Sequence, residues 1–170
     1  MPDAEETPTK EMSLWEHVGE LRKRLLWALV AMIITTGVCA AFGQDLIRIL
    51  ARPIGGVDVL VSIEVTENVG VFMRVALLGG FILAFPVILW QLLGFVLPGL
   101  TEKERRSVLL AIPFATILFA AGVLFAYYVM LPAALPFLIS FIGIKTTPRL
   151  SNYFSFVTSL LFWIGVSFES

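Results

Sequence analysis

Few residues in this sequence could perform catalysis or hold a metal ion. His17 is the single histidine and Cys39 the single cysteine, so neither a histidine cluster nor a cysteine-rich metal site nor an internal disulfide can be built. An enzyme acting within apolar segments would need a nucleophile and base, or a set of metal ligands, and the sequence offers neither. It therefore predicts a protein that is not an enzyme and uses no metal or cofactor.

Three glutamates are the remaining candidates for chemistry. Glu20 precedes Arg24 by four residues, a spacing that predicts an ion pair on one helix face. Glu104 follows Thr101 by three residues, which predicts a capping box at a helix start. Glu169 ends an apolar run, and a carboxylate at membrane depth indicates function because an ionised group there is costly. The alternative explanation for a carboxylate at this position is that Glu169 lies next to the end of the sequence and has no function there.

The elements that position these glutamates are predicted to be membrane-spanning helices. The 170 residues are 58% hydrophobic and only 15% charged, with a mean hydropathy of +0.92, which a water-soluble domain cannot accommodate. A net charge of −1 argues against a nucleic-acid partner. We expect an all-α polytopic membrane protein with about four spans, near 25–42, 71–97, 108–131 and 153–170.

The two ends of the chain carry separate predictions. Residues 1–12 are polar and predicted to be disordered, and 13–170 to form one transmembrane domain. A signal peptide is the alternative interpretation of the first apolar run, but an organised amphipathic stretch precedes it. The last apolar run, 153–168, would measure only about 24 Å against a hydrocarbon core of about 30 Å. We therefore interpret the fourth span as incomplete and the sequence as C-terminally truncated, or as a fragment that needs a partner.

Prolines divide the connections and bend the spans. Pro53 lies in the segment 43–70, which should hold short helices or extended chain outside the bilayer. Pro86 should kink the second span, which membrane bundles tolerate. Pro132 and Pro136 are expected to close the third span.

The distribution of basic residues predicts the orientation. With the N-terminus inside, seven basic residues lie on the cytoplasmic side and five on the far side, and six of the seven belong to the clusters Arg22–Arg24 and Lys103–Arg106. Positive charge favours the cytoplasmic side, so the N-terminus is expected to be cytoplasmic. Such clusters also have affinity for anionic lipid.

Several stretches resemble one known family. Residues 17–25 (HVGELRKRL), 86–106 (PVILWQLLGFVLPGLTEKERR), 125–132 and 155–169 are together similar to TatC, the signal-peptide receptor of the twin-arginine protein export system. The likeness covers about 14–169, in family order. The family has six spans, whereas this sequence supplies three and most of a fourth.

The resemblance implies roles for four residues. Glu20 and Glu104 would receive the paired arginines of a signal peptide at the cytoplasmic face, since guanidinium groups favour carboxylates in bidentate geometry. Phe95 would help to form the signal-binding surface, or would be a packing aromatic. Glu169 would contact partner helices or line an intramembrane polar patch. The resemblance also includes Pro53 and Pro86, whose expected role is structural.

The resemblance also implies partners and a location. The chain would bind twin-arginine signal peptides of folded cargo and recruit TatA- and TatB-type single-span proteins, as a homo-oligomer within a hetero-complex in lipid. Transport would use the proton-motive force, and the location would be the plasma membrane of a prokaryote. The alternatives are a small membrane transporter or channel subunit, and an inactive truncated remnant. A solute path needs polar residues at the middle of several spans, where only Thr35, Thr36 and Thr116 occur.

Overall fold

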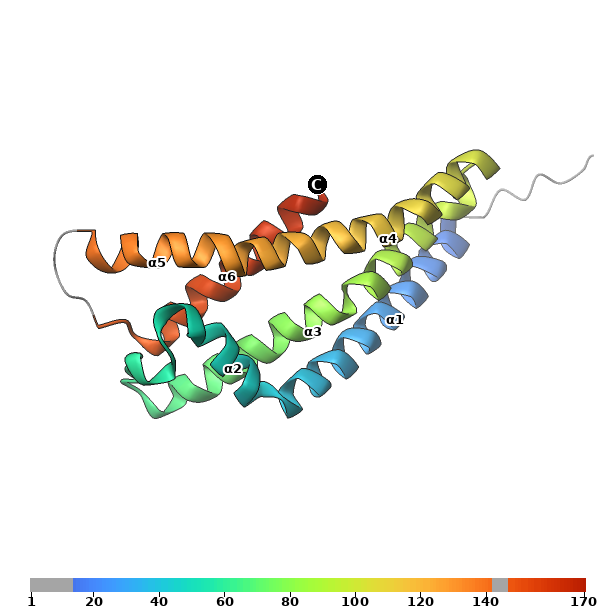
Figure 1. Ribbon diagram of the computed structural model, residues 1–170. Coiled ribbons are helices and arrows are strands. Elements are labelled where there is room, and N and C mark those ends of the chain that lie inside the picture. Colours follow the sequence, from blue (N-terminus) through green and yellow to red (C-terminus); the bar gives the residue numbers. More distant parts are fainter. Residues whose placement is uncertain (1–13, 142–146) are drawn as a thin grey trace, which may run out of the picture.

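The structure is a computed structural model that describes residues 14–141 and 147–170. The predicted tail 1–12 lies outside the described residues. Every regular element in the described part of the chain is helical, apart from one isolated bridge between Val61 and Arg149. The long helices lie side by side as an elongated bundle (Figure 1).

The helices follow one another in a simple order. The long ones are α1 (Leu14–Ala41), α3 (Val65–Val96), α4 (Glu102–Phe125), α5 (Leu131–Ser140) and α6 (Leu150–Glu169). The short ones are α2 (Gly43–Ala51), η1 (Arg52–Ile54), η2 (Val57–Val59), η3 (Leu97–Gly99) and the π turn η4 (Ala126–Met130). Four helical stretches of the described residues are long and apolar enough to cross a membrane. The predicted class, an all-α polytopic membrane protein, is confirmed.

Small residues let α1 and α3 approach closely. A Cβ atom at Gly80 would lie 2.2 Å from the Thr36 hydroxyl oxygen, and one at Gly79 would lie 2.9 Å from the Cys39 sulfur. The Thr35 hydroxyl also donates a 2.8 Å hydrogen bond to the carbonyl of Gly80. Close packing and interhelical hydrogen bonds replace the hydrophobic effect as the force that joins helices in lipid. The single cysteine is therefore a packing residue of the α1–α3 contact.

Helices α4 and α6 also approach each other closely at small residues. Gly122 of α4 and Gly165 of α6 face each other, and a Cβ atom at Gly122 would lie 3.2 Å from Cα of Gly165. Next to them, the rings of Phe85 and Phe119 stack with centroids 3.8 Å apart. This ring pair joins α3 to α4, so the two helix pairs form one bundle.

The segment before α3 forms short helices, as predicted. It contains α2 and two single turns, and Pro53 lies in the turn η1, which Gly55 ends with a φ of 105°. Helix α3 begins at Val65, six residues before the expected start, because Glu64 and Glu67 form a capping box there. It continues through Pro86 without interruption.

The prediction that Pro132 and Pro136 close the third span was wrong about where the helix ends. Helix α4 passes through η4 into α5, and the rod continues to Ser140 (Figure 1). The wider π turn lies directly before Pro132, where the Leu131 amide bonds to the Ala126 carbonyl. Irregular turns of this kind let a membrane helix accommodate a residue that lacks an amide donor.

The length expected for the fourth span also needs correction. Helix α6 begins at Leu150, three residues before the predicted start, and has 20 residues. Such a helix measures about 30 Å, which matches the thickness of a bilayer hydrocarbon core. The segment is therefore long enough to cross a membrane.

Candidate functional site

Two of the predicted site carboxylates lie at the same end of the bundle. The start of α1, the end of α3 and the start of α4 meet there (Figure 1), and they carry Glu20, Phe95 and Glu104. We call this region the Glu20 end. The starts of α3 and α6 lie at the opposite end, which we call the Glu67 end after its buried carboxylate.

Glu20 uses only half of its carboxylate within the protein. Its Oε1 atom accepts hydrogen bonds from Nε and Nη2 of Arg24, at 3.0 and 2.8 Å, so the predicted ion pair is present. Its Oε2 atom is buried and has no hydrogen-bond partner among the described residues. Burying a carboxylate oxygen without a donor is unfavourable, so this atom is suited to a donor from a ligand.

A recess of about 670 Å³ opens beside Glu20. It is lined by residues of α1 and α3, namely Gly19, Glu20, Lys23, Arg24, Trp27 and Gln91. A negative carboxylate oxygen, an amide group and an indole ring thus surround one space. These are groups that a planar cation can contact by hydrogen bonding and stacking.

Glu104 forms the predicted capping box. Its Oε2 accepts bonds from the amide and the hydroxyl of Thr101, at 2.9 and 2.8 Å, and the side chain is exposed. The hydrogen bond from the Thr101 amide, with that from its hydroxyl, holds the pKa of Glu104 below its ordinary value. The residue is in the first turn of a helical rod of 39 residues, about 58 Å long, and so lies beyond the hydrocarbon core. It is negatively charged at neutral pH.

Phe95 is part of the contact between α1 and α3. Its ring stacks on the imidazole of His17, with centroids 4.2 Å apart and an interplanar angle of 25°. The ring is half-buried. It therefore has a packing role at the Glu20 end.

Glu67, at the other end, has every carboxylate oxygen engaged. Its Oε1 accepts bonds from the Ser151 amide at 2.6 Å and from Arg149 Nε at 3.2 Å. Its Oε2 accepts bonds from the Ile63 amide at 3.0 Å and from the Glu64 amide at 3.4 Å. Glu67 therefore joins the start of α3 to the start of α6.

These bonds keep Glu67 ionised. The residue is in the first turn of a 32-residue helix, about 48 Å long, so it lies outside the hydrocarbon core. Hydrogen bonds, that from the Ile63 amide foremost, lower the pKa of Glu67 to about 2. Sequence reasoning missed this residue because its partner Arg149 is 82 positions away.

Glu169 is the last residue of α6. Its Oε2 atom is buried and has no hydrogen-bond partner within 14–141 and 147–170. The neighbouring Phe168 packs against Phe125 of α4, with ring centroids 5.5 Å apart. A polar partner would be favourable for this carboxylate, because a buried oxygen without a hydrogen-bond donor is costly.

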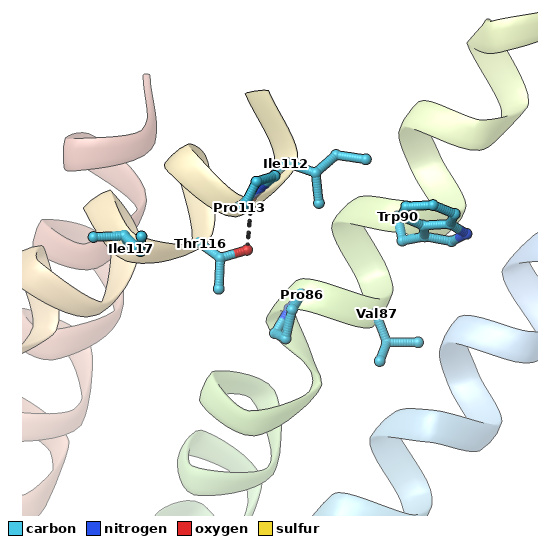
Figure 2. A pocket seen from close by; sticks show the side chains of 7 residues that line it. All are labelled: Pro86, Val87, Trp90, Ile112, Pro113, Thr116 and Ile117. Atoms are coloured by element: carbon cyan, nitrogen blue, oxygen red, sulfur yellow. Dashed lines mark hydrogen bonds between the residues drawn. The ribbon is translucent and has the colours of Figure 1, made fainter. Parts of the chain in front are cut away.

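The recess between α3 and α4 is apolar. A volume of about 530 Å³ is lined by Pro86, Val87 and Trp90 of α3 and by Ile112, Pro113, Thr116 and Ile117 of α4 (Figure 2). Its one hydroxyl, that of Thr116, already donates to the Ile112 carbonyl at 2.8 Å. Pro86 and Pro113 thus shape the facing helices, and the recess offers a polar solute no free hydrogen-bonding side chain apart from the Trp90 indole.

One further contact joins α3 to α6. The guanidinium of Arg74 on α3 donates to the hydroxyl of Ser155 on α6. The sequence offers no local signal for a bond between residues 81 positions apart.

Comparison with known proteins gives a consistent result. The family model of the Sec-independent protein translocase protein TatC matches residues 16–170. The TatC protein of Carboxydothermus hydrogenoformans is 36% identical over 163 residues, which cover 94% of this chain and 67% of that protein. The TatC proteins of Synechocystis sp. and Aquifex aeolicus are both 38% identical, with 63% and 69% of their lengths covered. The chain thus spans about two thirds of these relatives, and 45% of a chloroplastic TATC of Oryza sativa.

Solved structures agree with the sequence comparison. A crystal structure of the twin-arginine translocase receptor TatC superposes with a TM-score of 0.80 at 34% identity, over 91% of this chain and 71% of that one. A second structure of the receptor, in DDM, gives a TM-score of 0.81. The chain described here therefore belongs to the TatC family of membrane-embedded Sec-independent protein translocase proteins.

Proposed function

We propose that this protein is a receptor that binds the paired arginines of a twin-arginine signal peptide at the Glu20 end. The observation that carries the proposal is the buried Oε2 atom of Glu20, which has no partner in the described part of the chain and belongs to a residue that lines a recess. A guanidinium group supplies donors in the planar geometry that a carboxylate prefers. Membership of the TatC family supports the same interpretation.

Two other residues that line the recess beside Glu20 would affect how it binds an arginine side chain. Trp27 lines it and is 58% exposed, so its indole can stack on a guanidinium plane. Lys23 lines it as well, and its charge opposes a cationic guest. Selectivity for arginine over lysine then comes from planarity and stacking rather than from net charge.

Glu104 is proposed to contact the second arginine. Its Oε1 atom accepts no hydrogen bond from the described residues, because both bonds from Thr101 reach Oε2. The capping box therefore fixes the carboxylate and leaves one oxygen for a ligand. Capping and ligand binding are compatible roles of one side chain.

The remaining parts of the proposal concern the assembly. Glu169, with its unpartnered buried oxygen, would contact a polar group of a TatA- or TatB-type single-span partner within a hetero-complex that contains several copies of this chain. The Glu20 end, with its basic clusters, would be cytoplasmic. Transport of folded cargo would use the proton-motive force, and the membrane would be the plasma membrane of a prokaryote.

The test is peptide binding to the full chain in nanodiscs. A labelled peptide with two arginines and an apolar stretch should bind more tightly than its lysine–lysine twin. Glu20→Gln should weaken binding of the arginine peptide about tenfold or more, because a charge-assisted bond is lost. Glu104→Gln should weaken it by a smaller factor, because its site is exposed.

Glu16→Gln is the matched control. Glu16 lies one helical turn before Glu20 and is exposed, so its replacement removes the same charge without touching the recess. Equal affinity for both peptides, or an equal loss in Glu16→Gln and Glu20→Gln, would contradict the receptor function proposed here.

A further inference from the structure

A second, smaller recess lies at the Glu20 end and has a different character. It occupies about 280 Å³ and is lined by Arg24 of α1, Gly94 of α3, Leu97 and Pro98 of η3, and Arg105 of α4. The helices α1, α3 and α4 meet at this end (Figure 1) and, with the turn η3, bring two arginine residues to one space whose other walls are apolar or backbone.

Arg24 is held in place from two sides. The Glu20 carboxylate binds its Nε and Nη2 atoms, which leaves Nη1 for a guest. Nη1 lies against Gly94, where a Cβ atom would be only 2.3 Å away. Glycine at this position is therefore what allows the guanidinium to enter the recess.

Arg105 has no competing partner. It forms no ion pair with any residue in the described part of the chain, although Glu102 and Glu104 lie on the same helix. Glu104 is directed to Thr101 by the capping box. The recess thus carries an uncompensated positive charge from Arg105 and a half-free guanidinium from Arg24.

The depth of the recess indicates where an anion would come from. Arg24 directly precedes the apolar run that begins at Leu25, and Arg105 lies three residues before Val108, where the next run begins. Residues at the edge of a membrane span lie in the headgroup layer. The negative groups at that depth are lipid phosphates.

We propose that Arg24 and Arg105 bind the phosphate of one anionic phospholipid between α1, α3 and α4, with the Leu97–Pro98 wall against the glycerol and upper acyl region. Guanidinium groups bind phosphate oxygens by charge-assisted, bidentate hydrogen bonds. This recess shares Arg24 with the recess beside Glu20 but differs from it in every other lining residue. The lipid proposal does not rest on signal-peptide binding. It would fix the start of α4 relative to α1.

Native mass spectrometry of the detergent-solubilised full chain tests the proposal. Phosphatidylglycerol and phosphatidylcholine with identical acyl chains are titrated separately, and inorganic phosphate is titrated in a third series. Phosphatidylglycerol should bind at least about fivefold more tightly than phosphatidylcholine, and inorganic phosphate at millimolar concentration should not displace it.

Three variants locate the site. Arg105→Gln should weaken phosphatidylglycerol binding about fivefold, whereas Arg106→Gln, which removes the same charge from a neighbouring residue outside the recess, should change it less than about twofold. Gly94→Ala keeps the charge but displaces the Arg24 guanidinium, so it should also weaken binding. The melting temperature of each variant is measured to establish that it is folded.

Three results would overturn the proposal. Equal losses in Arg105→Gln and Arg106→Gln would mean that the lipid responds only to overall charge. Equal binding of the two lipids would exclude a phosphate site selective for anionic lipid. Displacement of the lipid by inorganic phosphate would assign the recess to a soluble anion.

Discussion

The two ends of the bundle each contain a glutamate–arginine pair, but the two pairs differ in what they leave free. At the Glu67 end, Glu67 is almost fully buried and both of its oxygens accept bonds from within the protein. At the Glu20 end, Glu20 pairs with Arg24 in the same helix and keeps one buried oxygen without a partner among the described residues.

The difference separates a carboxylate whose oxygens are all bonded within the protein from one that keeps an oxygen without a partner among the described residues. The Glu67 pair joins two helices, whereas the Glu20 pair spans one turn of one helix and adds little to the fold. A saturated carboxylate has no acceptor left for a guest, while an unsaturated buried one gains a hydrogen bond when a guest arrives. Residue type alone does not distinguish the two.

The largest expected effect is on stability, at the Glu67 end. Glu67→Gln should lower the melting temperature in detergent on the order of 5 °C or more, because Arg149 and the amide groups around Glu67 lose their charged acceptor. Circular dichroism on heating measures it. The control is Glu64→Gln, since Glu64 also contacts Arg149, at 3.3 Å, but is 66% exposed.

A similar decrease in melting temperature in both variants would mean that the buried position of Glu67 between α3 and α6 adds nothing to stability beyond its charge. The Glu64 pair lies in water, where such contacts add little. Comparing the melting temperatures of Glu67→Gln and Glu64→Gln thus distinguishes the loss of a buried ion pair from the loss of an exposed one.

The next effect is on pH dependence. The pKa of Glu67 is lowered to about 2 in the folded protein, so its stabilising contribution is present above its ordinary pKa and is lost as pH falls from about 4.5 toward 2. The melting temperature of the wild-type protein should therefore exceed that of Glu67→Gln most at neutral pH. The difference should shrink below pH 4.5. A constant difference down to pH 2.5 would contradict the assignment.

The smallest expected effect concerns Lys23. Since Lys23 lines the recess beside Glu20, Lys23→Gln should tighten binding of the arginine peptide about twofold to fivefold, by removing a like charge. Fluorescence anisotropy with the labelled peptide measures it. Lys103→Gln removes the same charge from α4, away from the recess, and should not tighten binding. Weaker binding in Lys23→Gln would place the peptide elsewhere.

The sequence predicted the contacts that are local. The Glu20–Arg24 pair and the Thr101–Glu104 capping box follow from spacings of four and three residues, because one helical turn brings such residues together. The helical class and the approximate spans could also be predicted, because each apolar run consists of consecutive residues. Both local pairs belong to the candidate site, so the Glu20 end was largely predictable.

The parts that could not be predicted depend on distant residues. The Glu67–Arg149 bond, the Arg74–Ser155 bond and the stack of His17 on Phe95 each join different helices, and no sequence period indicates such pairs. The helix past Pro132 was missed because a π turn removes the usual penalty of proline.

A paired measurement compares the roles of Glu20 and Glu67. Arginine-peptide affinity and melting temperature are measured on Glu20→Gln and Glu67→Gln in the same preparation of nanodiscs. We expect a crossed result: Glu20→Gln weakens the peptide about tenfold with little change in melting temperature, and Glu67→Gln lowers the melting temperature while the folded fraction binds normally. Parallel losses in both variants, or a loss of stability without a loss of affinity in Glu20→Gln, would contradict the account.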